Sequence, residues 1–151
     1  MTGLIPGFNS DGVITVNRIV LKSEYTVADL EERVATLCEN VKTYHSGTGF
    51  VGGFVAVNAG MVSNEGSTIG QAVNSPLKDK EALIVTFWQS FEDHERSHRS
   101  DTFQPLFKQV LDLCENGNEE IAYRLLWSGK GYSAKEAKAA REAKERYAIA
   151  A

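Results

Sequence analysis

The sequence predicts an α+β fold in which a strand, a helix, two strands, a helix and a strand follow one another. The main observation is that the apolar residues switch between the two-residue spacing of strands and the three- to four-residue spacing of helices. The chain has 151 residues, 42% of them hydrophobic and 24% charged, with three prolines. This composition fits one packed domain and excludes disordered and collagen-like chains.

The first half of the pattern begins with a strand over residues 13–21, whose sequence VITVNRIVL is rich in β-branched residues. Residues 26–44 then have helical spacing. Thr26 and Asp29 can form a reciprocal cap at the start of this helix, and Gly47 can stop it. The apolar residues that carry the helical spacing are Val27, Leu30, Val34, Leu37, Val41 and Tyr44.

The second half begins with predicted strands over residues 50–58 and 82–91. Ser90 has the spacing of a helix cap, and the helical region that follows is interrupted over residues 100–105, because proline is tolerated only in the first turn of a helix. Residues 120–128 form the last predicted strand. The resulting order β-α-β-β-α-β is that of ferredoxin-like domains.

Both faces of the predicted strands are apolar. In residues 13–21, for example, Ile19 and Leu21 fall on one face and Val16 and Val20 on the other. Two helices can cover only one face of a four-stranded sheet, so something else must bury the other face. We expect a second copy of the chain, giving a homodimer with its two sheets face to face, and the C-terminal tail is the alternative cover.

Three segments lie outside this minimal unit of residues 13–128. Residues 1–12 form an N-terminal arm, and residues 59–81 form a long connection that we interpret either as a lid over the pocket or as a plain excursion. Residues 129–151 form a basic extension, since residues 130–151 hold six basic and three acidic side chains. Within it, residues 133–147 predict a helix with a Ser-x-x-Glu cap.

The net charge of −4 and the absence of a basic stripe argue against a nucleic-acid partner. No stretch has the pattern of a signal peptide or a membrane span. The two cysteines, Cys38 and Cys114, are too few for a disulfide framework, and we expect both on apolar helix faces. These features favour a protein of the reducing cytoplasm.

Residues 87–94, FWQSFEDH, are followed by His98, Ser100 and Phe103. This segment resembles the third strand and second helix of the antibiotic biosynthesis monooxygenase family of dimeric α/β barrels, and the resemblance extends over residues 13–128. It implies a homodimer with one pocket per subunit between the sheet and the helices. Characterised members include cofactor-independent oxygenases that act on polycyclic phenols, and heme-degrading proteins.

The heme-degrading branch fits poorly. Asn17 and Arg18 match the position of its pocket asparagine, but its tryptophan and its heme-ligating histidine fall on Ser97 and Phe107 here. The resemblance therefore implies no heme, unless a histidine on a different turn binds the iron. We expect no cofactor.

In the cofactor-free branch, an activated substrate loses a proton and its carbanion reacts directly with dioxygen. Asn17 and His98, helped by His94, are the expected catalytic residues, which orient and deprotonate a small aromatic substrate. Each has a structural alternative: a satisfied core amide for Asn17, and exposed residues at the start of a helix for the histidines. The expected substrate-binding residues are Trp88, Phe107, Phe103 and Tyr44. Alternatives on this scaffold are a non-oxidative cyclase, isomerase or decarboxylase, and a non-catalytic binder of a small ligand or heme.

Residues 94–98 also match His-Glu-x-x-His, the zinc motif of metalloproteases. That motif needs a long continuous helix and a third ligand. Here Pro105 shortens the helix, Arg96 and Arg99 flank the motif, and the only other histidine is His45. The sequence therefore predicts no metal site at these histidines.

Overall fold

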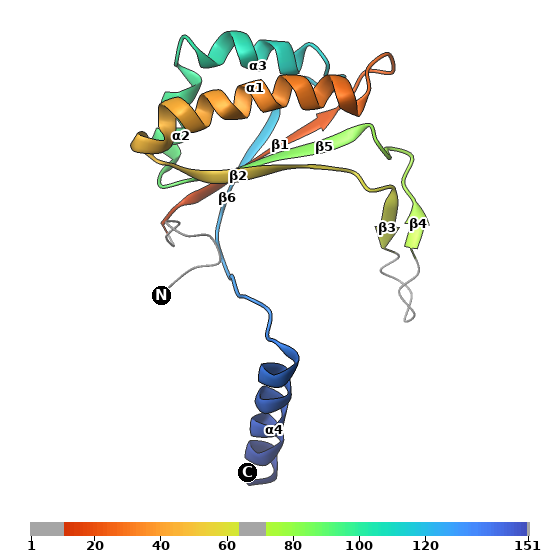
Figure 1. The fold of residues 1–151 in the computed structure, drawn as a ribbon, viewed down its shortest axis with the longest axis vertical. Coiled ribbons are helices and arrows are strands. Elements are labelled where there is room, and N and C mark those ends of the chain that lie inside the picture. The colour runs from red at the N-terminus through yellow and green to blue at the C-terminus, as the bar shows by residue number, and fades with distance from the viewer. Residues whose placement is uncertain (1–10, 64–71, 151) are drawn as a thin grey trace.

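The computed structural model describes residues 11–63 and 72–150, in which a four-stranded antiparallel sheet is covered on one face by three helices (Figure 1). The order of the main elements confirms the ferredoxin-like α+β prediction. The elements are β1 (Val13–Val20), α1 (Val27–His45), the short 3-10 helix η1 (Ser46–Thr48), β2 (Phe50–Val57), β3 (Met61–Ser63), β4 (Ala72–Asn74), β5 (Glu81–Trp88), α2 (Phe91–His98), α3 (Phe103–Leu111), β6 (Glu119–Arg124) and α4 (Ala134–Ala150).

The strand order in the sheet is β2-β5-β1-β6. The central strand β1 pairs with β5 on one side and with β6 on the other, so that Asn17 lies opposite Ile84 and also opposite Glu120. Since directly opposed residues point to the same side of a sheet, these three side chains lie on one face. It is the face that the helices cover.

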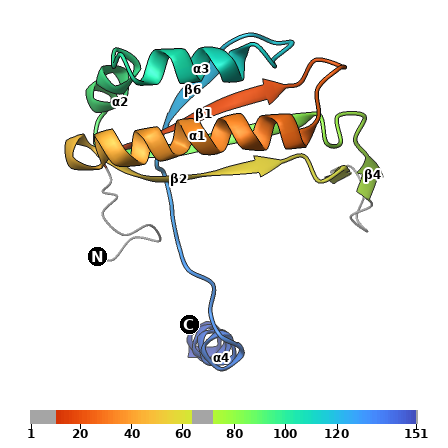
Figure 2. The same ribbon diagram turned by 45° about the horizontal axis from the view of Figure 1, so that its top comes forward.

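The core fills the space between this face and the helices, where α1 and α3 run side by side (Figure 2). Trp88 is the largest fully buried side chain, and full burial of a large apolar side chain contributes about 1.5–3 kcal/mol. The other buried members of the core cluster are Ile19, Leu21, Leu30, Val34, Leu37, Val41, Ala82, Ile84, Phe103, Val110, Leu113 and Cys114.

The helix ends follow the capping pattern with one correction. Asp29 accepts a hydrogen bond from the backbone N–H of Thr26 at 2.8 Å, and Ser90 caps α2. However, α1 does not stop at Gly47: it ends at His45 and continues as η1, and the left-handed residue that closes the turn is Gly49, with φ of 108°. Glycine is favoured at that position because it has no side chain to clash in the left-handed region.

The predicted break between the two halves of the second helical region is confirmed. Pro105 is the third residue of α3, and the backbone N–H groups of the first turn of a helix have no partner within the helix, so the N–H that proline lacks is not needed there. The prediction for Cys114 was wrong, because α3 ends at Leu111 and Cys114 instead forms an isolated bridge with Leu21.

The connection between β2 and β5 contains a small hairpin that the sequence did not predict. Its strands β3 and β4 pair at the end of the sheet remote from α2 (Figure 1). Each has only three residues, too few to carry a readable periodicity. Residues 64–71 of the expected lid, and residues 1–10 of the N-terminal arm, lie outside the described residues.

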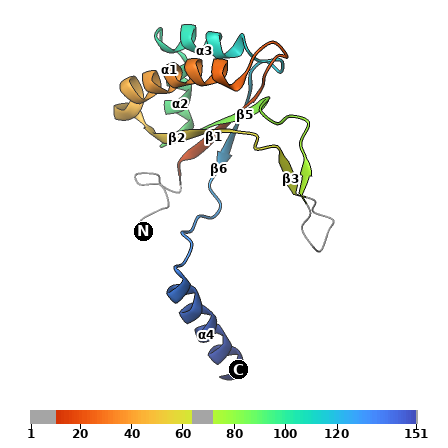
Figure 3. The same ribbon diagram turned by 45° about the vertical axis from the view of Figure 1, so that its right-hand side comes forward.

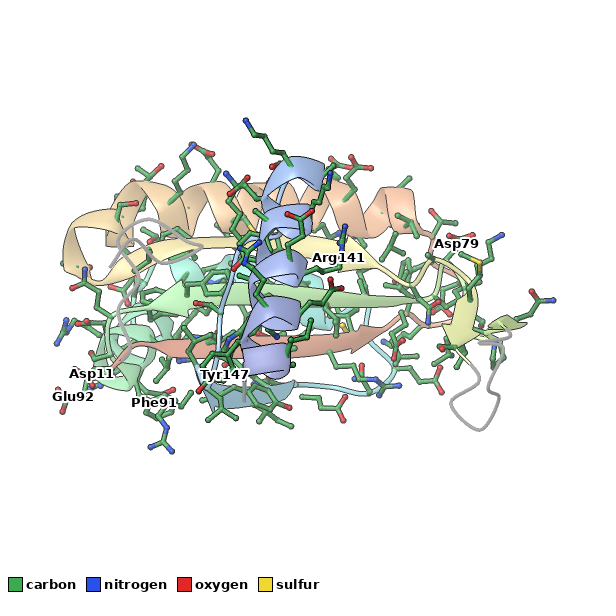
Figure 4. The ribbon with its side chains drawn as sticks, turned by 90° about the horizontal axis from the view of Figure 1, so that it is seen from below. Asp11, Asp79, Phe91, Glu92, Arg141 and Tyr147 are labelled. Carbon is green, nitrogen blue, oxygen red and sulfur yellow. The ribbon has the colours of Figure 1, made fainter. Side chains whose placement is uncertain are left out.

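The second face of the sheet, seen from below in Figure 4, is apolar, as predicted, and no described helix packs against it. Phe54, Leu83, Ile121 and Tyr123 lie on this outer face and are each between 38% and 54% exposed. At one end, Arg18 forms ion pairs with Glu81 and Glu119 at 2.6 and 3.1 Å. The outer face is therefore an apolar surface with a polar end.

The C-terminal extension forms the expected helix, capped by Ser133 and Glu136, whose backbone N–H groups each bond to the other's side chain at 3.1 Å. The preceding segment is extended, with Leu126 and Trp127 99% and 81% exposed. As a result, α4 stands away from the domain, on the side of the outer face (Figure 3). Among the described helices, none combines the length and the apolar character needed to cross a membrane.

Candidate active site

A cavity of about 560 Å³ lies between α1, α3 and the helix-covered face of the sheet. Such a volume is in the range of small-molecule sites. Aromatic residues from three elements, β2, β5 and α3, contribute to its wall, among them Phe50, Trp88, Phe103 and Phe107. Polar side chains in the lining include Asn17, Ser97, His98 and Glu120. The cavity is thus a mainly apolar space with polar groups at several points of its wall, since Glu39, Lys42, Ser46 and Thr86 also line it.

Two elements, α2 and β6, bring together a group that we call the His–Glu–His cluster, formed by His94, His98 and Glu120. The Oε1 atom of Glu120 lies 3.2 Å from Nε2 of His94 and 3.7 Å from Nε2 of His98. On its other side, Nδ1 of His94 lies 3.1 Å from Oε1 of Glu95. The carboxylate of Glu120 therefore sits between two imidazoles.

Local sequence explains how the cluster is assembled. His94 and His98 are four residues apart on α2 and so share a helix face. The start of α2 is fixed by Ser90, whose hydroxyl accepts a hydrogen bond from the Asp93 N–H at 3.1 Å. Glu120 reaches the cluster because β6 pairs with β1 and places it opposite Asn17.

The environment of His98 favours its neutral form. Burial lowers the pKa of His98, and the neighbouring His94 lowers it further, while Glu120 and Glu95 oppose this shift. A neutral imidazole retains a lone pair that can accept a proton. His98 is therefore a proton acceptor at neutral pH, with a carboxylate beside it that stabilises the protonated form.

Aromatic contacts hold the site in place. The ring of His98 stacks on Phe103 with centroids 4.6 Å apart, and Phe107 lies 5.6 Å away. Trp88 contacts His94 edge-on at 5.5 Å, and its Nε1 donates a hydrogen bond to Thr86 at 2.8 Å. The histidines are thus confined between packed rings.

Asn17 supplies an amide to the same cavity and is 8% exposed. Its Nδ2 donates to Oδ1 of Asn118 at 3.3 Å. Because an amide nitrogen carries two N–H groups, this single long bond leaves donor capacity for a ligand.

No family model and no curated protein matches this chain, but solved structures do. SnoaB, a cofactor-independent oxygenase from Streptomyces nogalater, is 16% identical over 80% of this chain and 99% of its own, with a TM-score of 0.58. A candidate antibiotic biosynthesis monooxygenase from Bordetella bronchiseptica is 14% identical over 78% and 99% of the two chains, with a TM-score of 0.56.

The chain has the fold of the antibiotic biosynthesis monooxygenases. A hydroxynitrile lyase from Passiflora edulis is also similar, with 11% identity over 81% of this chain and all of its own, and a TM-score of 0.57. These similarities therefore support the fold that the sequence predicted, but they do not select one reaction.

The cavity brings together most of the residues that the sequence singled out, since Asn17, Trp88, His98, Phe103 and Phe107 all line it. His94 lies behind this wall, 2% exposed, and is not among the lining residues.

Tyr44, the remaining residue expected to bind substrate, is 59% exposed and does not line the cavity, because the helical period carries the buried stripe of α1 from Val41 to His45. Its role in substrate binding stays a prediction.

The structure adds a residue to the site that the sequence did not single out. The sequence missed Glu120, although it is the first residue of a predicted strand. The described residues of the 59–81 connection contribute no side chain to the cavity lining.

Ser97 and Phe107 both line the cavity. They stand where the heme-degrading proteins have their tryptophan and their heme-ligating histidine, and neither carries an imidazole that could bind heme iron. The donor atoms of the His–Glu–His cluster all lie within 4.8 Å of one another, so the cluster has the composition to hold a metal ion.

Proposed function

We propose that this protein is an enzyme that removes a proton from a small, hydrophobic phenolic substrate, whose carbanion then reacts with dioxygen without a cofactor. The observation that carries the proposal is the position of His98: it is a neutral imidazole on the wall of an aromatic cavity, with a carboxylate 3.7 Å from its Nε2. The similarity to a cofactor-independent oxygenase supports the oxidative outcome.

In this mechanism, Nε2 of His98 takes a proton from an activated methylene group of the substrate, and Glu120 stabilises the imidazolium that forms. The negative charge moves onto the substrate oxygen, where the free N–H of Asn17 stabilises it. Dioxygen adds to the carbanion; one of its atoms becomes the new carbonyl oxygen, and the other leaves as water with the two hydrogens of the methylene.

The aromatic wall has two roles in this proposal. Phe103, Phe107 and Trp88 provide flat apolar surfaces against which an aromatic ring can pack. They also exclude water, which strengthens the electrostatic contribution of Asn17 and protects the carbanion from reprotonation. A small aromatic substrate therefore fits the cavity better than a polar metabolite.

A second candidate is a non-oxidative reaction on the same scaffold: a cyclisation or isomerisation that starts with the same proton transfer, or a decarboxylation, in which loss of carbon dioxide forms the carbanion and a proton then replaces it. The similarity to a hydroxynitrile lyase favours it, because that protein shares the fold and is named for a non-oxidative reaction. The oxidative reaction and a cyclisation or isomerisation differ only in the fate of the carbanion.

The test is dioxygen uptake with anthrone and quinol substrates in buffer that contains a chelator. We expect uptake by the wild type and a loss of about 10²-fold or more in His98→Ala, with a smaller loss in Asn17→Ala. Tyr44→Phe, which changes an exposed side chain outside the cavity, serves as the matched control. Uptake that persists in His98→Ala, or no uptake with any phenol, would contradict the oxidative proposal.

Deuterium exchange into the substrate under anaerobic conditions separates the second candidate. Exchange that depends on His98 without any later dioxygen uptake would favour a non-oxidative reaction.

We also propose that the active form is a homodimer closed across the outer face of the sheet. The exposed Phe54, Ile121 and Tyr123 support this, because an apolar surface of this kind is costly to leave in water. Sedimentation velocity at micromolar concentration should give twice the 16.6 kDa mass of one chain, and Ile121→Asp should give the monomer. Tyr44→Asp adds the same charge elsewhere and should leave the dimer intact; a monomeric wild type would refute the proposal.

A further inference from the structure

We infer that the His–Glu–His cluster is a binding site for one divalent transition-metal ion of the Zn²⁺ or Co²⁺ type. The inference goes beyond the proposed function, which needs no metal. It reverses the expectation from the sequence, where no third ligand was available to the two histidines. The third ligand is Glu120, which comes from a strand 22 residues further along the chain.

The composition of the cluster selects the class of ion. Two imidazole nitrogens and one carboxylate oxygen suit zinc and its neighbours in the first transition row, while calcium and magnesium prefer sites made only of oxygen. Three protein ligands with one open side are also the arrangement of metal sites that accept a further ligand. Here the open side faces the cavity, since His98 and Glu120 line it.

The distances fit such an ion. Bonds of about 2.0–2.1 Å in a tetrahedral site separate the ligand atoms by about 3.3 Å. The atom pairs Glu120 Oε1–His94 Nε2 and Glu120 Oε1–His98 Nε2 are 3.2 and 3.7 Å apart, and all three donor atoms lie within 4.8 Å of one another.

A second, independent feature is the residue behind His94. Metal-binding histidines usually donate their other ring N–H to a carboxylate, which orients the ring and makes it a stronger ligand. Nδ1 of His94 lies 3.1 Å from Oε1 of Glu95, while its Nε2 points to Glu120. The buried His94 is thus oriented as a metal ligand before any ion arrives.

Metal binding and the proposed proton transfer compete for the same lone pair on Nε2 of His98. An ion in the cluster therefore removes the base, and we expect Zn²⁺ to inhibit dioxygen uptake until a chelator removes it. Dioxygen uptake, which tests the proposed function, is measured in the presence of a chelator, and metal binding is measured without substrate. Either proposal can therefore fail without affecting the other.

The test begins with full-length protein stripped by a chelator and dialysed. Calorimetric titration with Zn²⁺ and with Co²⁺ should show one saturable site per chain, and bound Co²⁺ should develop visible d–d absorption. Glu120→Gln and His98→Gln keep the side-chain size approximately and should each weaken binding at least tenfold. Glu95→Gln should weaken it about tenfold.

Glu115→Gln is the matched control, because Glu115 is an exposed carboxylate outside the cluster. This variant should bind Zn²⁺ and Co²⁺ with the affinity of the wild type. Circular dichroism confirms that each variant is folded before titration. Absence of saturable binding to the wild type would overturn the inference. So would undiminished binding to Glu120→Gln and His98→Gln, which would place the ion elsewhere.

Discussion

Replacing Gly53 with alanine places a methyl group against the backbone of the neighbouring strand. Gly53 lies on β2 opposite Thr86 of β5 and contributes to the wall of the cavity. A Cβ atom added there would lie 2.5 Å from the carbonyl oxygen of Val85 and 3.2 Å from two atoms of Thr86. The nearest atom belongs to the backbone, so the strands themselves must move apart.

The neighbouring residue offers a matched control. A Cβ atom added at Gly52 meets nothing within 4 Å. We expect Gly53→Ala to lower the free energy of unfolding by about 1–3 kcal/mol, the usual cost of overpacking. Gly52→Ala should be neutral or stabilising by about 0.4–1 kcal/mol, because alanine restricts the unfolded chain.

Urea denaturation followed by circular dichroism measures both variants, and thermal unfolding should shift by about 2–4 °C for each kcal/mol in a chain of this size. Equal stability of Gly53→Ala and wild type would refute the close approach of β2 and β5. Equal destabilisation by the two substitutions would show that flexibility, and not space, requires glycine here.

Three further predictions concern other parts of the molecule. Asn116→Ala should cost about 1–3 kcal/mol in urea denaturation, because the Asn116 side chain accepts from the N–H of Val20 at 3.0 Å and donates to the carbonyl oxygen of Arg18 at 2.9 Å; an unchanged midpoint would contradict this. Burial lowers the pKa of His45 below its usual 6.5, so the unfolded chain binds more protons than the folded chain, and the free energy of unfolding falls as the pH drops below about 6.5. In His45→Gln this free energy should fall less steeply with pH, and the same pH dependence in the variant and the wild type would contradict the prediction. Ser133→Ala removes the cap of α4 and should speed amide exchange in its first turn, by the equivalent of about 1 kcal/mol, while the domain's urea midpoint stays the same.

Local patterns in the sequence were sufficient for most of the fold. The β-branched residues of β1 and the capping residues Thr26 and Ser90 each act through near neighbours, which a single sequence displays. The predicted strand over 82–91 was three residues too long at its C-terminal end, because Ser90 already caps the next helix. The hairpin of β3 and β4 depends on pairing between segments and left no local pattern.

The residues of the candidate site likewise divide into those that a local pattern identifies and those that only the tertiary structure identifies. Alternation along a strand groups Asn17 with Ile19 and Leu21 on one face, and the structure shows that this is the face that the helices cover. Tyr44 could not be separated from His45, since steps of three and of four residues both continue a helical stripe. Glu120 joins the cluster only through the register between β6 and β1, which is set by the packing of the whole sheet. Tertiary structure was needed for the one residue that completes the chemistry.

The strand β2 forms one edge of the four-stranded sheet in the described part of the chain, with β5 as its neighbour. Its eight residues, FVGGFVAV, include no charge and no proline, and Val55 and Val57 are 42% and 44% exposed. Natural sheets usually protect such an edge with lysine, proline or a covering segment, because its free backbone groups can pair with another extended chain. The strand that walls the cavity is therefore also a point from which aggregation can start when the protein is concentrated.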